Sequence, residues 1–154
     1  MSYDLPWGVR LQSLVTLQSG RPFTLYSGTD SPFGTNNNRL MNVPGALVFA
    51  PSARRAVMIA DASSRPLLSP PRGVFGTLAR NTAVSDSLLS VNIGVYKRFA
   101  LTDRVGIELR GEVFNLANTV NYNPPDGVLT SPNFGQTLTA NDSRQMQVAV
   151  RLNF

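Results

Sequence analysis

The chain has 154 residues and a formal charge of +5, from thirteen arginines and Lys97 against nine acidic residues. It contains no cysteine and no histidine, which excludes disulfide frameworks, the usual zinc sites and histidine-dependent catalytic triads. No run of eighteen apolar residues could form a transmembrane helix, and the arginines are dispersed instead of clustered, which disfavours a nucleic-acid partner. We therefore expect no metal ion, no cofactor and no bound nucleic acid.

The first predicted strand covers about residues 9–19. Its odd positions carry mostly apolar side chains and its even positions mostly polar ones, a period of two that is typical of a strand with unlike faces. Leu14 interrupts the polar face. Because Pro22 cannot donate a hydrogen bond to a ladder, we expect a bulge or the end of pairing near residues 20–22, with a looser extension to Ser27.

A long stretch from residue 28 to residue 87 follows, rich in glycine, proline and asparagine and with little periodicity. We interpret it as a loop, in which residues 54–61 are expected to form one or two helical turns. A second stretch of the same kind runs from residue 117 to residue 143. Loops this long are uncommon in compact soluble domains, so both stretches disfavour an ordinary globular fold.

Two further strands are predicted over residues 89–101 and 105–116, joined by a tight hairpin turn at residues 102–104. Apolar residues dominate their odd positions, apart from Lys97, and polar or small residues occupy most even positions. Both segments are longer than the roughly 5–6 residues that are usual for strands of globular sheets.

The last predicted strand covers residues 144–154 and shows the clearest alternation. Apolar residues are Met146, Val148, Val150, Leu152 and Phe154, and the residues between them are Gln145, Gln147, Ala149, Arg151 and Asn153. Because roughly 9–11 residues suffice for a transmembrane β-strand, we expect the first set to face lipid and the second to face a hydrated lumen.

The connections alternate in length as they do in outer-membrane barrels, where short turns lie on the periplasmic side and long loops lie outside. The sequence therefore predicts an all-β antiparallel meander of about four long transmembrane-type strands. The turn at 102–104 and both chain ends are expected in the periplasm, and the two long stretches are expected to be extracellular loops.

A series of short motifs adds a family resemblance. The motifs are Ser19-Gly-Arg-Pro-Phe-Thr24, Gly76-Thr-Leu-Ala-Arg-Asn81, Tyr96-Lys-Arg-Phe99, Glu112-Val-Phe-Asn-Leu-Ala-Asn118, Asn133-Phe-Gly135 and Arg144-Gln-Met-Gln147. In this order, and followed by a final aromatic residue, they resemble the C-terminal barrel end of TonB-dependent outer-membrane receptors, most closely the Oar-like group. The resemblance covers nearly the whole chain except about residues 28–75.

The resemblance implies a barrel of about twenty-two strands around a plug. Such a receptor takes up a bulky, scarce solute, and an inner-membrane energy-coupling complex acts on it through the plug. The resemblance also implies that the barrel-assembly machinery recognises the closing strand with its terminal aromatic residue, here Phe154. We expect this chain to be a C-terminal fragment without plug or signal peptide, located in a Gram-negative-type outer membrane. Its expected partners are lipid, the remaining barrel strands, the plug and the assembly machinery.

Candidate catalytic chemistry is confined to Glu108, Arg110 and Glu112, which share one face of a predicted strand. By strand rise, the two carboxylates stand about 13 Å apart. A glycosidase pair needs roughly 5–9.5 Å, so a hydrated lumen wall with compensating charges explains them better. We expect no enzyme activity and assign no catalytic residue. The alternative function is a soluble β-sandwich binding module of carbohydrate-binding or adhesin type.

The two alternatives predict different behaviour in water. Expressed alone without detergent, a barrel segment should aggregate, because its apolar stripes and open sheet edges are exposed. Size-exclusion chromatography with light scattering measures this directly. A monodisperse monomer that melts cooperatively in plain buffer would instead support the sandwich.

Overall fold

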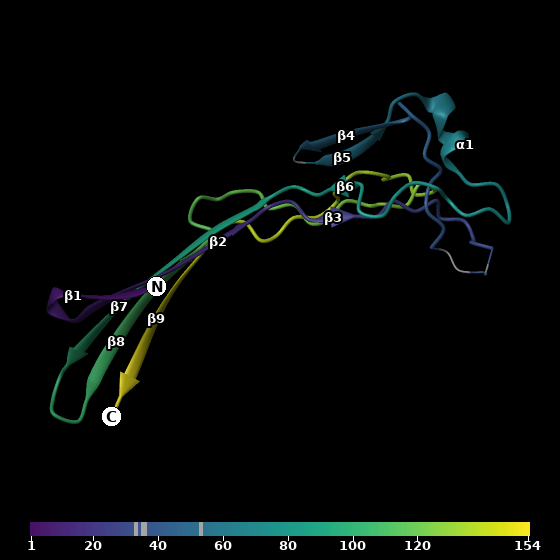
Figure 1. The fold of residues 1–154 in the computed structure, drawn as a ribbon. Coiled ribbons are helices and arrows are strands. Elements are labelled where there is room, and N and C mark those ends of the chain that lie inside the picture. Colours follow the sequence, from purple (N-terminus) through teal and green to yellow (C-terminus); the bar gives the residue numbers. More distant parts are fainter. Residues whose placement is uncertain (33, 35–36, 53) are drawn as a thin grey trace. The chain divides into compact units, whose positions relative to one another are not determined.

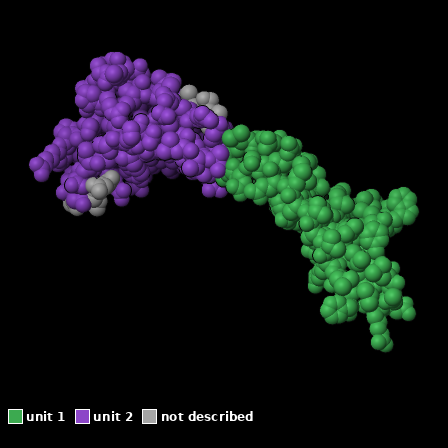
Figure 2. Space-filling model, turned by 180° about the vertical axis from the view of Figure 1, so that it is seen from behind, with its two compact units in different colours: residues 1–18, 88–121, 141–154 green, residues 19–87, 122–140 purple. Residues whose placement is uncertain are grey.

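The computed structural model describes residues 1–32, 34, 37–52 and 54–154. The chain divides into two compact units, which are coloured separately in Figure 2. The sheet unit comprises residues 1–18, 88–121 and 141–154, and the loop unit comprises residues 19–87 and 122–140. No helix among the described residues is long and apolar enough to cross a membrane.

The sheet unit is one antiparallel sheet of five strands in the order β1-β2-β7-β8-β9 (Figure 1). The strands are β1 (Ser2–Leu5), β2 (Val9–Gln18), β7 (Leu88–Ala100), β8 (Gly106–Phe114) and β9 (Gln145–Asn153). The four long strands predicted from the sequence are therefore present within two residues of their expected bounds. The sheet is not closed, and β1 and β9 form its edges.

Strand β1 was not expected, and it extends the predicted sheet by one member. It pairs with β2 through a short 3-10 turn, η1 (Pro6–Gly8), in which Trp7 and Gly8 have φ values of 65° and 71°. Its four residues are too few for a period of two to stand out in the sequence.

The register of the sheet keeps most like side chains on like faces, although Leu14 lies opposite Asn92 and Phe114 opposite Gln145 on the polar face. On one face Leu11 lies opposite Val95, Phe99 opposite Ile107, and Leu109 opposite Val150. On the other face Arg10 lies opposite Tyr96, Tyr96 opposite Arg110, and Glu112 opposite Gln147. The predicted segregation of apolar from polar residues thus holds from strand to strand.

The turn between β7 and β8 is as tight as predicted. The backbone N–H groups of Leu101 and Thr102 both donate to the carbonyl of Val105, at 2.9 and 3.0 Å. The Thr102 hydroxyl accepts a 3.0 Å hydrogen bond from the Val105 N–H in return.

Asparagine side chains end the strand pairing at the opposite end of the sheet. Asn115 has φ 50°, which stops β8 at Phe114, and its N–H donates to the Asn92 side chain at 2.9 Å. Asn121 bonds both backbone groups of Leu89, accepting from its N–H and donating to its carbonyl at 2.8 Å. These bonds replace the ladder of a neighbouring strand, because an asparagine side chain offers one acceptor and one donor group as a peptide does.

The loop unit is a packed structure rather than the irregular loop expected from the sequence. It holds two small antiparallel pairs, β3 (Pro22–Phe23) with β6 (Ala83–Val84) and β4 (Leu47–Ser52) with β5 (Arg55–Ile59). Its core contains Leu25, Leu40, Ala46, Ala56, Val57, Leu68, Leu78, Ala83, Leu129 and Phe134. All ten lie in this unit, so the two long stretches, distant in sequence, share one hydrophobic core.

The helical turns predicted for residues 54–61 are absent, because this segment contains strand β5. Backbone pairing with β4 and with residues 135–137 outweighs the local helix preference of its alanines. Helical structure begins afterwards, with η2 (Ala62–Ser64) and α1 (Arg65–Leu68). The hydroxyl of Ser63 donates to the Asp61 carboxylate and lowers its pKa below the ordinary value.

Gly76 marks one place where the loop unit tolerates no side chain. A Cβ there would lie 1.8 Å from the Arg39 carbonyl oxygen and 2.7 Å from that of Leu40. The Gly76 N–H also donates to the buried side chain of Asn38 at 2.9 Å. The residue is therefore required by close approach of two backbone segments.

Gly76→Ala should loosen the loop unit by about 1–3 kcal/mol or more, because the methyl group overlaps fixed backbone atoms. Gly111→Ala is the control, since a Cβ at Gly111 meets nothing within 4 Å. Limited proteolysis of the protein should cut the loop unit faster in the first variant only. Equal cleavage rates would contradict the packing described.

Candidate functional site

One face of the sheet is apolar and exposed, although the chain possesses a conventional core elsewhere. On β9, Val148 is 82% exposed and Val150 is 67% exposed, whereas Val57 in the loop unit is fully buried. Exposed apolar side chains on this face come from all five strands: Tyr3, Leu5, Val15, Leu17, Val95, Phe99, Leu109, Met146, Val148, Val150 and Leu152. A continuous apolar surface of this kind is what a lipid-facing barrel wall presents.

Lys97 is the charged exception on the apolar face. Its ammonium group lies 4.9 Å from the centroid of the Phe99 ring, which gives a cation–π contact. A lysine stem can lie along apolar surface while the charged end extends toward the interface. The position is compatible with the edge of a membrane, since β7 ends three residues later at Ala100.

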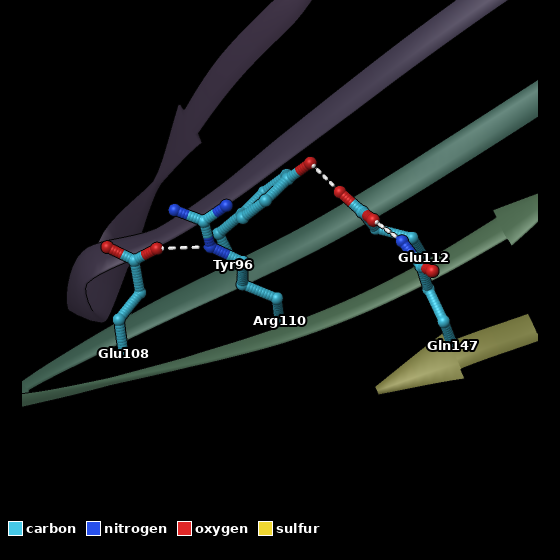
Figure 3. A network of polar contacts seen from close by, with 5 residues as sticks. All are labelled: Tyr96, Glu108, Arg110, Glu112 and Gln147. Atoms are coloured by element: carbon cyan, nitrogen blue, oxygen red, sulfur yellow. Dashed lines mark hydrogen bonds and ion pairs between the residues drawn. The ribbon is translucent and has the colours of Figure 1, made fainter. Parts of the chain in front are cut away.

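The opposite face carries a network of polar contacts (Figure 3). Arg110 donates to Glu108 with its Nε at 2.5 Å, and its guanidinium lies 5.5 Å from the ring centroid of Tyr96. The Tyr96 hydroxyl donates to one oxygen of Glu112 at 2.5 Å, and the Gln147 amide donates to the other. Three strands, β7, β8 and β9, are tied together by these side chains.

Glu108 and Glu112, the two carboxylates considered as candidate catalytic groups, have different partners in this network. Glu108 pairs with Arg110 on its own strand, and Glu112 bonds to Tyr96 and Gln147 on the two neighbouring strands. In register, Glu108 also lies opposite Arg98 and Arg151. The arrangement balances charge along the face, as expected for a hydrated wall.

A second ion pair joins edge strand β1 to β2, and it was not predicted from the sequence. Arg10 donates to Asp4 at 2.7 Å, and both side chains are mostly exposed. The pair depends on β1, and the only signal for it was the alternation of Ser2 and Asp4 with Tyr3 and Leu5. An exposed pair like this contributes little to stability, about 0–1 kcal/mol.

Shallow hollows lie over the polar face. The larger has a volume of about 520 Å³ and is lined mainly by charged residues and Tyr96. The next, of about 510 Å³, lies over Gln12, Asn92, Tyr96, Glu112 and Phe114. Among the described residues, no group of three or more acidic, histidine or cysteine side chains is placed to hold a metal ion. The polar face therefore presents hydrogen-bonding groups and compensated charges, which suit a hydrated lumen.

An antiparallel sheet with long strands, one continuous exposed apolar face and one charge-balanced polar face defines a piece of membrane-barrel wall. Comparison with known families agrees, because the family described as outer membrane beta barrel domain matches residues 7–147. The chain belongs to this family, and its location is the outer membrane, in contact with membrane lipid. No curated protein and no solved structure matches the chain.

Two arginine substitutions on β9, made in an outer-membrane barrel protein that carries this segment, test the assignment of faces. Val150→Arg places a charge on the lipid face and should cost about 2–4 kcal/mol near mid-membrane, which impairs assembly. Gln147→Arg places the same charge on the hydrated face and should be tolerated. Heat-modifiable migration in gels measures the inserted fraction. Equal effects of the two changes would contradict the assignment of Val150 to the lipid face and Gln147 to the lumen face.

Proposed function

We propose that this chain is the C-terminal barrel segment of a TonB-dependent outer-membrane receptor of the Oar-like group. In the intact receptor it forms wall and loops around the uptake path of a bulky, scarce solute. It has no enzymatic role and uses no cofactor. The segment alone carries no transport cycle, because the energy-coupling complex acts through a plug contributed by the rest of the receptor.

The observation that carries this proposal is that the family-like motifs contact one another in space. The Thr24 hydroxyl, from the first motif, bonds the backbone N–H and side chain of Asn81, from the second. The Arg144 N–H, from the last motif, donates to Asn118 at 3.1 Å. Each motif alone is weak evidence for the family. Because motifs that are distant in sequence are joined by hydrogen bonds, their combination supports a shared origin with receptors that carry the same series.

Tyr96, from a further motif, is connected through the polar network to Glu112 and Gln147, which belong to the same two motifs as Asn118 and Arg144 (Figure 3). The same residues hold together β7, β8 and β9, so the resemblance and the sheet depend on common contacts. The motif Asn133-Phe-Gly135 contributes in the loop unit, where Phe134 joins the core and Gly135, at φ 72°, approaches the backbone of Val57.

The proposed partners follow from the open sheet. Its edges β1 and β9 carry backbone groups that require further strands in lipid, where an unpaired peptide group costs several kcal/mol. We assign these edges to the remaining barrel strands and the polar face to the lumen that holds the plug. We place the long loops outside and the turn at residues 102–104 in the periplasm.

The soluble sandwich is the weaker alternative. A sandwich would bury the apolar stripes of β7 and β9 in one dry core, but Val148 and Val150 are largely exposed. Membership of the outer-membrane barrel family favours the lipid-facing interpretation as well.

Phe154 provides the test of the proposed function. We expect the barrel-assembly machinery to recognise β9 through this aromatic residue, and an aromatic ring also suits the interface between lipid and water. In a TonB-dependent host receptor whose closing segment is replaced by this chain, deletion of Phe154 should lower the inserted, heat-modifiable fraction. Uptake by the intact chimera should require the inner-membrane energy complex.

Deletion of the exposed loop residue Asn37 is the matched control and should leave insertion unchanged. Unchanged insertion after both deletions would show that the closing-strand role is wrong. Uptake that persists without the energy complex would overturn the receptor assignment itself.

A further inference from the structure

A hollow on the loop unit combines apolar and cationic groups, and nothing described above uses it. It has a volume of about 440 Å³. It is lined by Val48, Arg55, Met58, Ile59, Ala60, Arg65, Pro132, Phe134 and Gln136. These residues come from both long stretches of the chain, so the site exists only when the loop unit is folded.

The apolar part of the site is the outward side of the β4–β5 hairpin. Val48 lies directly opposite Met58 in the register, and they are 42% and 38% exposed. In the next pair, Val57 is fully buried in the core, whereas Phe49 is 45% exposed and does not line the hollow. The core thus holds the hairpin in place and leaves Val48 and Met58 at the surface, beside Phe134.

The two arginines of the hollow are not neutralised by a carboxylate. Arg65 donates to the backbone carbonyls of Leu129 and Ser131, which fixes the guanidinium but leaves its positive charge uncompensated. Every acidic residue of the chain is among the described residues. The ion pairs that these acidic residues form involve Arg10 and Arg110, and neither Arg55 nor Arg65. Arg65 also retains unused N–H donors, since a guanidinium has five.

The charge of the whole unit acts in the same direction. Seven arginines lie in the loop unit, against four aspartates and no glutamate or lysine. None of the four aspartates lines the hollow. A ligand that enters it meets positive charge and apolar surface together.

We propose that this hollow binds a solute that carries an oxyanion, such as a carboxylate, on an apolar or aromatic body. Arg55 and Arg65 bind the oxyanion, because a planar guanidinium matches the geometry of such groups. Val48, Met58 and Phe134 contact the apolar body. The inference rests on the proposed receptor function, which makes the loops the first part of the molecule to meet a solute from outside.

The test uses the chimeric receptor in nanodiscs of zwitterionic lipid, with 4-phenylbutyrate as the probe and the neutral 4-phenylbutyramide as its matched analogue. Saturation-transfer NMR titration should show binding of the carboxylate that is about tenfold or more tighter than binding of the amide. Arg55→Gln should weaken carboxylate binding by a similar factor. Met58→Gln should weaken binding of both probes.

Arg72→Gln is the matched control, because Arg72 is an exposed arginine of the same unit that does not line the hollow. It should leave binding unchanged. Equal binding of carboxylate and amide, no effect of Arg55→Gln, or an equal effect of Arg72→Gln would each overturn the proposal. Adding lipopolysaccharide to the nanodiscs should not displace the probe; displacement would assign the site to a lipid instead of a solute.

Each receptor variant is also checked for heat-modifiable migration and for resistance of its loops to protease. Loss of binding in a variant that remains inserted and protease-resistant supports the site. Absence of binding in an intact, energy-dependent receptor overturns the site and leaves the proposed function standing.

Discussion

Backbone pairing in a fixed register is the constraint on which the rest of this structure depends. In hydrocarbon, each N–H and C=O group of a strand must bond to its neighbour, so β2, β7, β8 and β9 are locked along their lengths. Because the side-chain period is two, a slip of one residue would move every apolar side chain to the wet face. The Tyr96–Glu112–Gln147 network opposes such a slip, since its bonds form in one register only.

The same chain uses two different ways of removing apolar surface from water. In the sheet unit, apolar side chains remain exposed on the protein and are covered by lipid. In the loop unit, ten buried residues form an ordinary core, and Leu25, Leu40 and Leu68 are fully buried in it. The apolar content of the sequence therefore divides between a surface and an interior, and the long loops are structured by the physics of soluble domains.

The strands could be predicted because a period of two over nine to thirteen residues is a strong local signal. The loop unit could not, since its core residues, such as Leu40 and Leu129, are irregularly spaced and meet only through tertiary contacts. The helical turns predicted for residues 54–61 were wrong because β5 is set by its pairing with β4 and with residues 135–137. Polar residues on the sheet were placed on the correct face, but the bonds of Asn115 and Asn121 depend on geometry that composition does not reveal.

Asn121 has a consequence for how the loops of this protein can change. By bonding both backbone groups of Leu89, it joins the start of β7, just after the first segment of the loop unit (19–87), to the residue that precedes the second segment of that unit (122–140). The positions of both loop ends are then set by the sheet and not by the loops themselves. A change within one loop can therefore leave the strand register intact, but it must preserve the hydrophobic core that the two loops share.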